Sequence, residues 1–381
     1  MSSRDVHKKE ILFLGAHMDM GGIAHSFNML APKLEEEGFK ISVVIPHKAD
    51  LLHLAIPLRY IKGYVWRFKI ENKWILRFVN FFNWLTHWKV YFFFAKKFSH
   101  DVFVVYAANM LPQWVVYSRK PTIGWLHGRW ALRMDSFMGP FFRRKVNRIS
   151  QEYFDMIGVS KAVCMSWEKE FLLRKNIKYI PNIVNPRSII DDLKNDRAEI
   201  SLKSNPVLLV VGRLSHEKGQ LRLLEVLSRL SKEGYKFSAY FIGSGNLEEL
   251  CKQEALKLNL QETVFFLGEK ENPYPYMKQA DLLIVPSYHE GRPCVITEAL
   301  VLGVPVLSTD SGGPRELLKD GEWGKLVENS TEGLYLGIKS YLINPSAGEP
   351  LVDSNDVIRE YEHMDKTSLA HIVASINRAL K

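Results

Sequence analysis

Short, continuous apolar runs recur along this 381-residue chain, and segments with helical periodicity alternate with them. The clearest run, Pro206 to Val211, shows no alternation of polar and apolar residues, which is typical of a strand buried on both faces. Strands of this kind that alternate with helices predict parallel α/β sheets. We expect strands near 10–15, 41–45, 102–106, 121–126, 155–159, 206–211, 237–242, 263–267, 282–286 and 304–308, and helices near 23–37, 137–150, 161–174 and 355–380.

The length of the chain predicts two domains of ordinary size, and its 46% hydrophobic fraction is sufficient for two cores. We place the first domain at 1–185, the second at 186–360 and a C-terminal helix at 361–381. The linker is expected within 181–205, because a polar stretch interrupts the strand and helix pattern there.

The cysteine content bears on the cellular compartment. Cys164, Cys251 and Cys294 are far apart and form neither a CxxC motif nor a zinc pattern. This favours a reducing, cytoplasmic compartment without a disulfide framework. The short apolar run 11–16 is interpreted as a buried strand rather than a signal peptide.

Charge is distributed unevenly along the chain, whose formal net charge is +9. Residues 1–185 contain 28 Lys or Arg and 14 Asp or Glu, whereas the remainder contains 23 and 28. This imbalance predicts an anionic partner for the first half.

Residues 59–98 contain nine Lys or Arg, one acidic residue and fifteen aromatic residues. The segment is too rich in charge to span a bilayer, but a basic helix with a Trp and Phe face suits the interface of an anionic membrane. The alternative is that the aromatic stripe packs against a sheet, as most amphipathic helices do. Basic and aromatic residues also serve nucleic-acid binding, but no nucleic-acid-binding fold signature is present and we expect no such partner.

Two glutamates flank a Gly-Arg-Pro turn in the stretch from His289 to Glu316. Pro293 suits the first position of a helix, where free backbone amides form an anion site. Glu298 would lie about 7–8 Å further along this helix. We therefore expect a ligand with a central diphosphate, a sugar near Glu290 and a ribose near Glu298, since carboxylates accept hydrogen bonds from sugar hydroxyls.

Two cations follow the buried strand 206–211. Arg213 comes directly after the strand end, and Lys218 opens the next helical pattern. Both can converge on a diphosphate at the carboxyl edge of a parallel sheet, where they would stabilise charge that develops on a leaving group. Gly21-Gly22 lies in a similar position after the first strand, as in phosphate-binding turns, although a Gly pair alone is weak evidence.

These motifs together resemble a known family, the retaining glycosyltransferases of family 4 ("glycosyltransferases group 1"), which have the two-domain GT-B fold. The resemblance is dense from about Pro206 to Val327 and sparse in the first half. The motifs that occur in family order are Gly21-Gly22, His127-Gly128, Val211-Gly212-Arg213-Leu214, Lys218-Gly219, Gly243-Ser244-Gly245, the Glu290 and Glu298 pair, and Ser311-Gly312-Gly313.

The resemblance implies two Rossmann-like parallel-sheet domains that face each other across a cleft, with the last helix crossing back to the first domain. It implies that His127, Arg213, Lys218 and Glu290 are catalytic. The donor-binding residues implied are Gly22, Gly243, Gly268, Gly291, Arg292, Pro293, Cys294, Val295 and Glu298. His25 stands where many members carry a basic residue, and Asn182-Ile183-Val184-Asn185 departs from the usual Asn-Gly-Val-Asp.

The resemblance also implies transfer of a hexose or N-acetylhexosamine from a nucleotide sugar, with a UDP-sugar favoured, and retention of anomeric configuration without a metal or other cofactor. The sequence contains no Asp-x-Asp motif and no metal cluster. The acceptor expected is lipid-linked or a polysaccharide, in the synthesis of a cell-surface glycan such as O-antigen, capsule or exopolysaccharide, at the cytoplasmic membrane face. The alternatives are a soluble enzyme that makes a small glycoside or glucan, and a degenerate membrane-bound scaffold.

Overall fold

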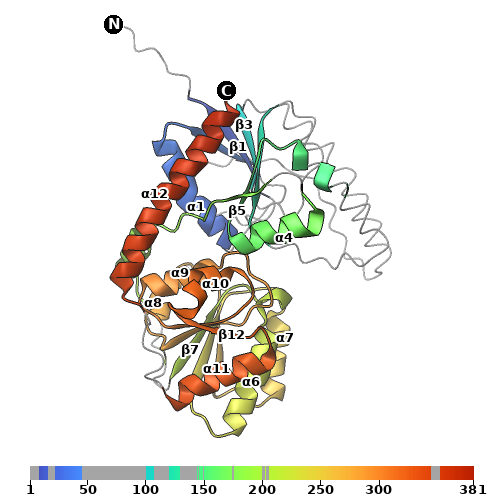
Figure 1. Ribbon diagram of the computed structural model, residues 1–381. Helices are drawn as coiled ribbons and strands as arrows, with labels where there is room; N and C mark the ends of the chain where they lie inside the picture. Colours follow the sequence, from blue (N-terminus) through green and yellow to red (C-terminus); the bar gives the residue numbers. More distant parts are fainter. Residues whose placement is uncertain are drawn as a thin grey trace. The chain divides into compact units, whose positions relative to one another are not determined.

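The computed structural model describes residues 8–15, 22–44, 100–106, 120–128, 144, 146–148, 150–173, 176–199, 202, 206–344 and 352–381. The chain divides into two compact units (Figure 1). The first unit comprises Met1–Ile183 with Thr367–Lys381, and the second comprises Val184–Lys366. Each unit contains a six-stranded sheet in which the paired strands are parallel. The basic aromatic segment 59–98 lies outside the described residues, so its membrane role stays a prediction.

The first unit has the strand order β2-β1-β3-β4-β5-β6. Its central strands β3 and β4 are buried along their whole length, as their apolar runs predicted. The elements are β1 (Glu10–Gly15), α1 (Gly22–Glu36), β2 (Lys40–Val44), β3 (Val102–Tyr106), β4 (Thr122–Leu126), β5 (Asp155–Gly158), α4 (Lys161–Phe171) and β6 (Lys178–Tyr179). The two-residue strand β6 was not expected from the sequence, because so short an element carries no periodic pattern.

The second unit has the strand order β12-β11-β10-β7-β8-β9. Its strands are β7 (Val207–Val211), β8 (Ser238–Ile242), β9 (Val264–Gly268), β10 (Leu282–Val285), β11 (Val306–Thr309) and β12 (Lys325–Val327). Its helices are α5 (Pro186–Asn195), α6 (Gln220–Lys232), α7 (Glu248–Lys257), α8 (Tyr274–Met277), α9 (Cys294–Val301), α10 (Gly313–Leu317) and α11 (Thr331–Ile343), with 3₁₀ turns η2 (His216–Lys218) and η3 (Lys319–Gly321).

The sheet of the second unit is covered on both faces, as shown by the side chains of β7. Leu209 belongs to one apolar core together with residues of α5, α8 and α9. Leu208 and Val210 belong to a separate core together with residues of α6, α7 and α11. Helices therefore pack on both sides of the strand, which explains why its sequence is apolar at every position rather than at alternate ones.

The C-terminal helix α12 (Ser354–Ala379) is continuous over 26 residues. Val357 and Tyr361 near its start belong to a core of the second unit, whereas Ile372 and Ile376 belong to the core of the first. The buried carboxylate of Asp155 in β5 binds this last part through Ser375 and Arg378. The expected return of the C-terminal helix to the first unit is therefore confirmed.

The linker region differs from the expectation. The polar stretch predicted as a linker contains helix α5, which begins with Pro186 at its first turn. Ile189 of this helix is 1% exposed and packs into the core of the second unit. The helix was missed because its exposed face is rich in charged and polar residues, and only a few apolar positions reveal its buried side.

Candidate functional site

The loops after β7 and β10 meet at the point where the strand order of the second unit reverses. Strand β7 pairs with β8 on one side and with β10 on the other. In open α/β sheets a ligand-binding crevice forms at the carboxyl ends of the strands that flank such a reversal. Lys218 follows β7 and Glu290 follows β10, so two of the motif residues predicted from the sequence meet here.

An ion pair joins the two loops. The Nζ atom of Lys218 lies 2.7 Å from Oε1 of Glu290, and the hydroxyl of Ser287 donates to the same oxygen at 2.7 Å. Glu290 is 8% exposed. A buried carboxylate that accepts two short hydrogen bonds has a fixed orientation. The pair therefore holds a cation and an acceptor group side by side at the reversal point.

Backbone contacts lock the same two loops together. The N–H of Tyr288 donates to the carbonyl of Glu217 at 2.8 Å. Gly219 adopts φ +70°, and a Cβ atom there would lie 2.0 Å from the carbonyl oxygen of Pro286. Only glycine satisfies both the left-handed backbone and this close approach. The position of Lys218 is thus fixed by the glycine that follows it.

A buried arginine also holds the loop after β10 in place. The guanidinium of Arg222 on α6 donates to the carbonyl of Pro286 at 2.9 and 2.6 Å and to Asn329 at 2.8 Å. It also lies over the ring of Tyr288, 3.8 Å from the centroid. The sequence did not predict Arg222, because an arginine in an amphipathic helix normally indicates a solvated face. It did not predict Ser287 or Tyr288 either, because their roles arise from tertiary contacts.

The remaining cation predicted for this site, Arg213, lies directly after β7 and is exposed. Its carbonyl accepts a hydrogen bond from Gln220 at 2.8 Å, while its guanidinium has no ion-pair partner in the part of the chain that the structure describes. Arg213 is therefore a cation at the sheet edge that is available to an anionic ligand.

Helix α9 begins immediately after the Gly-Arg-Pro turn. Pro293 is the N-cap, with φ −69° and ψ 113°, rather than the first helical residue as predicted, and Cys294 takes that first position. The shift arises because ψ of Pro293 is still extended. No acidic side chain lies in the first turn. The N–H of Ile296 donates to the carbonyl of Pro293 at 3.2 Å, and the first amides of a helix point away from its body at this end. The turn consequently still presents amides suited to an anion.

Glu298 lies on α9 one turn after Cys294 and is 8% exposed. Burial, reinforced by the charge of Glu298, raises the pKa of the Cys294 thiol to about 12. The thiol therefore stays protonated and neutral at physiological pH, so Cys294 lines the candidate site but does not act as a nucleophile. Arg292 contacts Met364 of α12, with its Nη2 3.7 Å from the sulfur.

The loop after β11 completes the group of connected loops. The N–H of Glu290 donates to the carbonyl of Ser311, and the N–H of Gly313 donates to the carbonyl of Glu290, both at 3.2 Å. A Cβ atom on Gly313 would lie 2.1 Å from the carbonyl oxygen of Gly291. The Ser-Gly-Gly motif thus serves the packing of backbone against the turn that precedes α9.

The glycines after β8 and β9 have two different surroundings. Gly243 adopts φ +132°, and a Cβ atom on it would lie 2.2 Å from the carbonyl oxygen of Gly212, while one on Gly245 would meet the carbonyl of Leu214 at 2.2 Å. Their close approach is therefore to the loop after β7. Gly268 has φ +67° with open space around it. Donor contacts of Gly243 and Gly268 stay predictions.

In the first unit, His127 follows β4 and is 9% exposed. Its ring lies 4.3 Å from that of Tyr106 and stacks on Trp125 at 6.2 Å. Burial lowers the pKa of His127 to about 3, so the imidazole is neutral at physiological pH. Its buried Nε2 has no hydrogen-bond partner among the described residues. The Nε2 atom of this neutral ring can form one hydrogen bond with a ligand, but the ring carries no positive charge for an anion.

Gly22 and His25 lie in the first turns of α1, after a turn that falls outside the described residues. Trp167 of α4 donates from Nε1 to the carbonyl of Gly128 at 2.9 Å, which anchors the His-Gly motif. The contributions of Gly22 and His127 to a donor site stay predictions.

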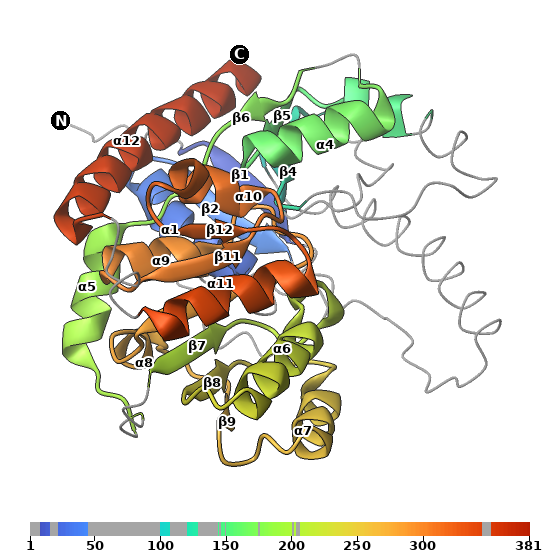
Figure 2. The same cartoon turned by 60° about the horizontal axis from the view of Figure 1, so that its bottom comes forward.

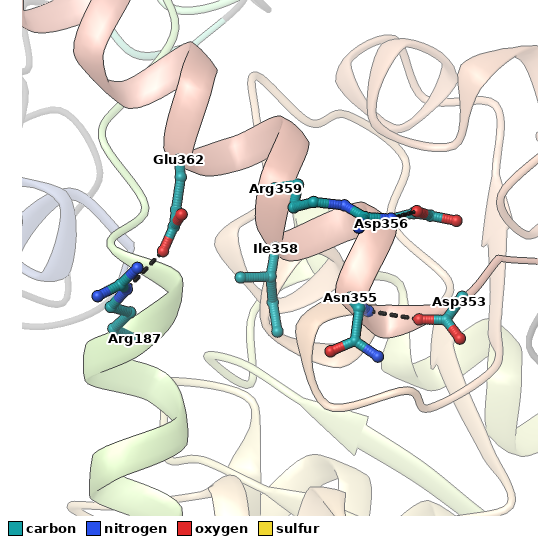
Figure 3. Close-up of a pocket in the computed structure, with 7 residues that line it drawn as sticks. All are labelled: Arg187, Asp353, Asn355, Asp356, Ile358, Arg359 and Glu362. Atoms are coloured by element: carbon teal, nitrogen blue, oxygen red, sulfur yellow. Dashed lines mark hydrogen bonds and ion pairs between the residues drawn. The ribbon is translucent and has the colours of Figure 1, made fainter.

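A separate cavity of about 590 Å³ lies in the second unit between α5 and the start of α12 (Figure 3). Four of its charged side chains form two ion pairs: Arg187 lies 2.5 Å from Glu362, and Arg359 pairs with Asp356. Since these exposed groups already have partners and no predicted site residue lines the cavity, the loops at the strand reversal are the better candidate. Among the described residues no cluster of His, Cys, Asp or Glu could hold a metal ion.

Comparisons with known proteins show what the second unit is similar to. Residues 192–360 match the family described as Glycosyl transferases group 1. A curated relative, the N-acetylgalactosamine-N,N'-diacetylbacillosaminyl-diphospho-undecaprenol 4-alpha-N-acetylgalactosaminyltransferase of Campylobacter jejuni, is 34% identical over 146 residues, or 38% of this chain and 39% of the relative. The chain covers 37%, 64% and 39% of the length of three curated relatives that it matches.

Solved structures show the fold over nearly the whole chain. A glycosyltransferase from Rickettsia africae aligns with a TM-score of 0.73 and 18% identity, covering 98% of this chain and 99% of that one. An Anabaena protein in complex with UDP aligns with a TM-score of 0.69 and 18% identity, covering 97% and 100%. The predicted GT-B architecture of two Rossmann-like units is confirmed. The second unit of the chain contains a glycosyl transferases group 1 domain.

Proposed function

We propose that this protein is a retaining, metal-independent glycosyltransferase that moves a hexose or N-acetylhexosamine from a nucleotide sugar to a lipid-linked or polysaccharide acceptor. The observation that carries the proposal is the ion pair between Lys218 and Glu290 at the strand reversal. In this pair Lys218 would bind a phosphate, and Glu290 beside it would accept a hydrogen bond from a sugar hydroxyl. The glycosyl transferases group 1 domain, which covers these loops, supports the same chemistry.

The donor diphosphate would lie over the first turn of α9, where backbone amides of the turn and the cations of Arg213 and Lys218 would bind it. Cleavage of the bond between the sugar and the diphosphate leaves negative charge on the leaving oxygen. Fixed donors and cations that face this oxygen stabilise the charge as it develops and need no reorganisation. Because protein groups meet the charge, we propose that transfer requires no metal ion or other cofactor.

Glu290 would accept hydrogen bonds from hydroxyls of the donor sugar, and Glu298 from the ribose. The two glutamates belong to the turn before α9 and to its second turn, on either side of the amides proposed to bind the diphosphate. Carboxylates at both ends fix the position of the ligand along the helix. A UDP-sugar is the favoured donor, in keeping with the UDP complex of the Anabaena neighbour.

The acceptor proposal follows from the named relative, whose substrate is linked to undecaprenol diphosphate. A lipid-linked acceptor would be reached from the cytoplasmic face of a membrane by a peripheral protein. In the described part of the chain no helix is both long and apolar enough to cross a bilayer. Anionic lipid is the partner that we propose for the basic first half.

The test is a panel of nucleotide sugars incubated with the purified full chain and an undecaprenyl-diphosphate sugar acceptor, with and without EDTA. We expect one donor to be consumed in both conditions and the new glycosidic bond to keep the anomeric configuration of the donor, as read by NMR. Loss of transfer with EDTA and rescue by Mg²⁺ or Mn²⁺ would contradict the metal-independent proposal, and an inverted product would contradict retention.

A further inference from the structure

A stripe of alternating basic and apolar side chains runs along the outer face of α4 in the first unit. Lys161, Met165 and Lys169 are spaced four residues apart, and Leu172 follows three residues later, at the C-cap. Side chains with these spacings lie on one face of a helix. We call these four residues the α4 stripe. The opposite face is buried in the core of the unit through Val163, Trp167 and Phe171.

The apolar members of the α4 stripe are unusually exposed. Met165 is 67% exposed and Leu172 is 71% exposed. In the described part of the first unit, the four exposed large hydrophobic side chains all fall within residues 154–179. Figure 2 shows that this part of the unit consists of α4 beside β5 and β6. Exposed apolar side chains gathered on one such element mark an interaction surface.

Leu172 is also in a backbone conformation that disfavours it. The residue adopts φ 49° and ψ 47°, in the left-handed region, at the C-cap of α4. Glycine or asparagine normally occupies this kind of position, because a side chain there is strained. Leu172 gains almost no burial in return for this strain, so its side chain does not serve the fold. A strained residue with an exposed side chain points to a function outside the fold.

The surroundings of the α4 stripe are basic. Among the charged side chains that the structure describes in residues 144–178, Arg144, Arg148, Lys161 and Lys169 are exposed, whereas Glu152 is the only exposed acidic one. Arg144 and Arg148 are exposed, and Asn147 between them donates from Nδ2 to the carbonyl of Leu172 at 2.5 Å, which places this basic segment at the C-terminal end of α4.

Asp155 and Glu168, two less exposed acidic residues of this region, have partners inside the unit. Asp155 binds Lys178 at 2.6 Å, and Glu168 accepts a hydrogen bond from the N–H of Ile177 at 2.9 Å. Among the described residues, the exposed charged groups around the α4 stripe are therefore mainly positive.

We propose that the α4 stripe docks the first unit onto an anionic lipid bilayer, with Met165 and Leu172 inserted among the acyl chains and Lys161 and Lys169 at the level of the phosphates. A basic helix with exposed apolar side chains suits the bilayer interface, where both kinds of side chain are stabilised together. The inference rests on the proposed action at a membrane but not on the donor chemistry, which belongs to the second unit. It is also separate from the predicted role of residues 59–98.

The test is co-sedimentation of the full chain with phosphatidylcholine vesicles that contain or lack phosphatidylglycerol. We expect binding only to the anionic vesicles. Met165→Gln together with Leu172→Gly should weaken it roughly tenfold, since insertion of two apolar side chains is lost. Lys161→Glu and Lys169→Glu should each weaken it about fivefold or more. The matched control is Leu256→Gln on α7, which removes a 58% exposed leucine from the second unit and should leave binding unchanged.

Leu172→Gly alone separates function from folding. Glycine relieves the left-handed strain, so this variant should unfold at the same or a higher temperature while its vesicle binding falls. Unchanged binding of the Met165→Gln, Leu172→Gly double variant, or an equal loss in the Leu256→Gln control, would overturn the inference. A second contradicting result concerns other polyanions. If the wild-type chain binds heparin or RNA more strongly than vesicles, and this binding also falls in the Lys variants, the inference is overturned. Titration of a nucleoside diphosphate into each variant distinguishes these outcomes from failure of the proposed donor site.

Discussion

The two units contain parallel sheets of six strands, but the polar groups at the strand ends differ. In the second unit, the loops after β7, β10 and β11 are joined by the Lys218–Glu290 ion pair, by Arg222 and by close backbone contacts through Gly219 and Gly313. In the described part of the first unit, the corresponding edge presents the neutral His127 among aromatic rings. The cations predicted to bind the donor therefore lie in the acidic half of the chain, so the net charge of each half does not predict where they are.

A second contrast concerns residues with a left-handed backbone. In the second unit, Gly219 occupies such a position where the loop is pressed against Pro286. In the first unit, Leu172 occupies one with its side chain in solvent. Gly219 stabilises the fold and positions Lys218. Leu172 lowers stability and leaves an apolar side chain on the surface.

The largest expected effect comes from removing the cations of the second unit. Lys218→Ala and Arg213→Ala should each lower turnover by about 10²–10³, because each removes a group that stabilises charge on the leaving oxygen. Steady-state kinetics with the best donor measures this. The matched controls are Lys252→Ala on α7 and Arg229→Ala on α6, which remove surface cations paired with Glu248 and Glu332 and should keep wild-type turnover. A Lys218→Ala variant with turnover equal to that of Lys252→Ala would show that the loops at the strand reversal are not the active site.

A smaller effect is expected from Gly219→Ala. The new methyl group must adopt a left-handed backbone, which costs about 1–2 kcal/mol, and it also meets the carbonyl of Pro286, so the free energy of unfolding should fall by more than this. Gly234→Ala is the control, because Gly234 has φ +90° with open space around it and should show the backbone cost alone. Denaturant unfolding of both variants gives the difference. Equal losses would mean that contact between the two loops contributes nothing to stability.

Much of the fold could be predicted because strands buried on both faces have continuous apolar sequences, as β7 and β10 do. The short strands β6 and β12 and helix α5 could not, since they carry too few apolar residues for a periodic pattern. Lys218 and Glu290 were predicted to belong to the same donor site, but their ion pair was not predicted, because spacing in sequence does not specify distance across a sheet. Arg222 and Ser287 escaped prediction, since their roles arise from tertiary contacts with the carbonyl of Pro286 and the carboxylate of Glu290.

The central claim is that α9 binds a diphosphate with Glu290 on the sugar side and Glu298 on the ribose side. Calorimetric titration of nucleoside diphosphate and of intact nucleotide sugar into Glu298→Gln and Glu290→Gln tests it most directly. We expect Glu298→Gln to weaken binding of the diphosphate by about tenfold, which is about 1.4 kcal/mol, as for the loss of a charged hydrogen bond. Glu290→Gln should leave that affinity nearly unchanged while reducing discrimination between donor sugars. Equal losses of diphosphate affinity in the two variants, with unchanged sugar discrimination, would contradict the assignment.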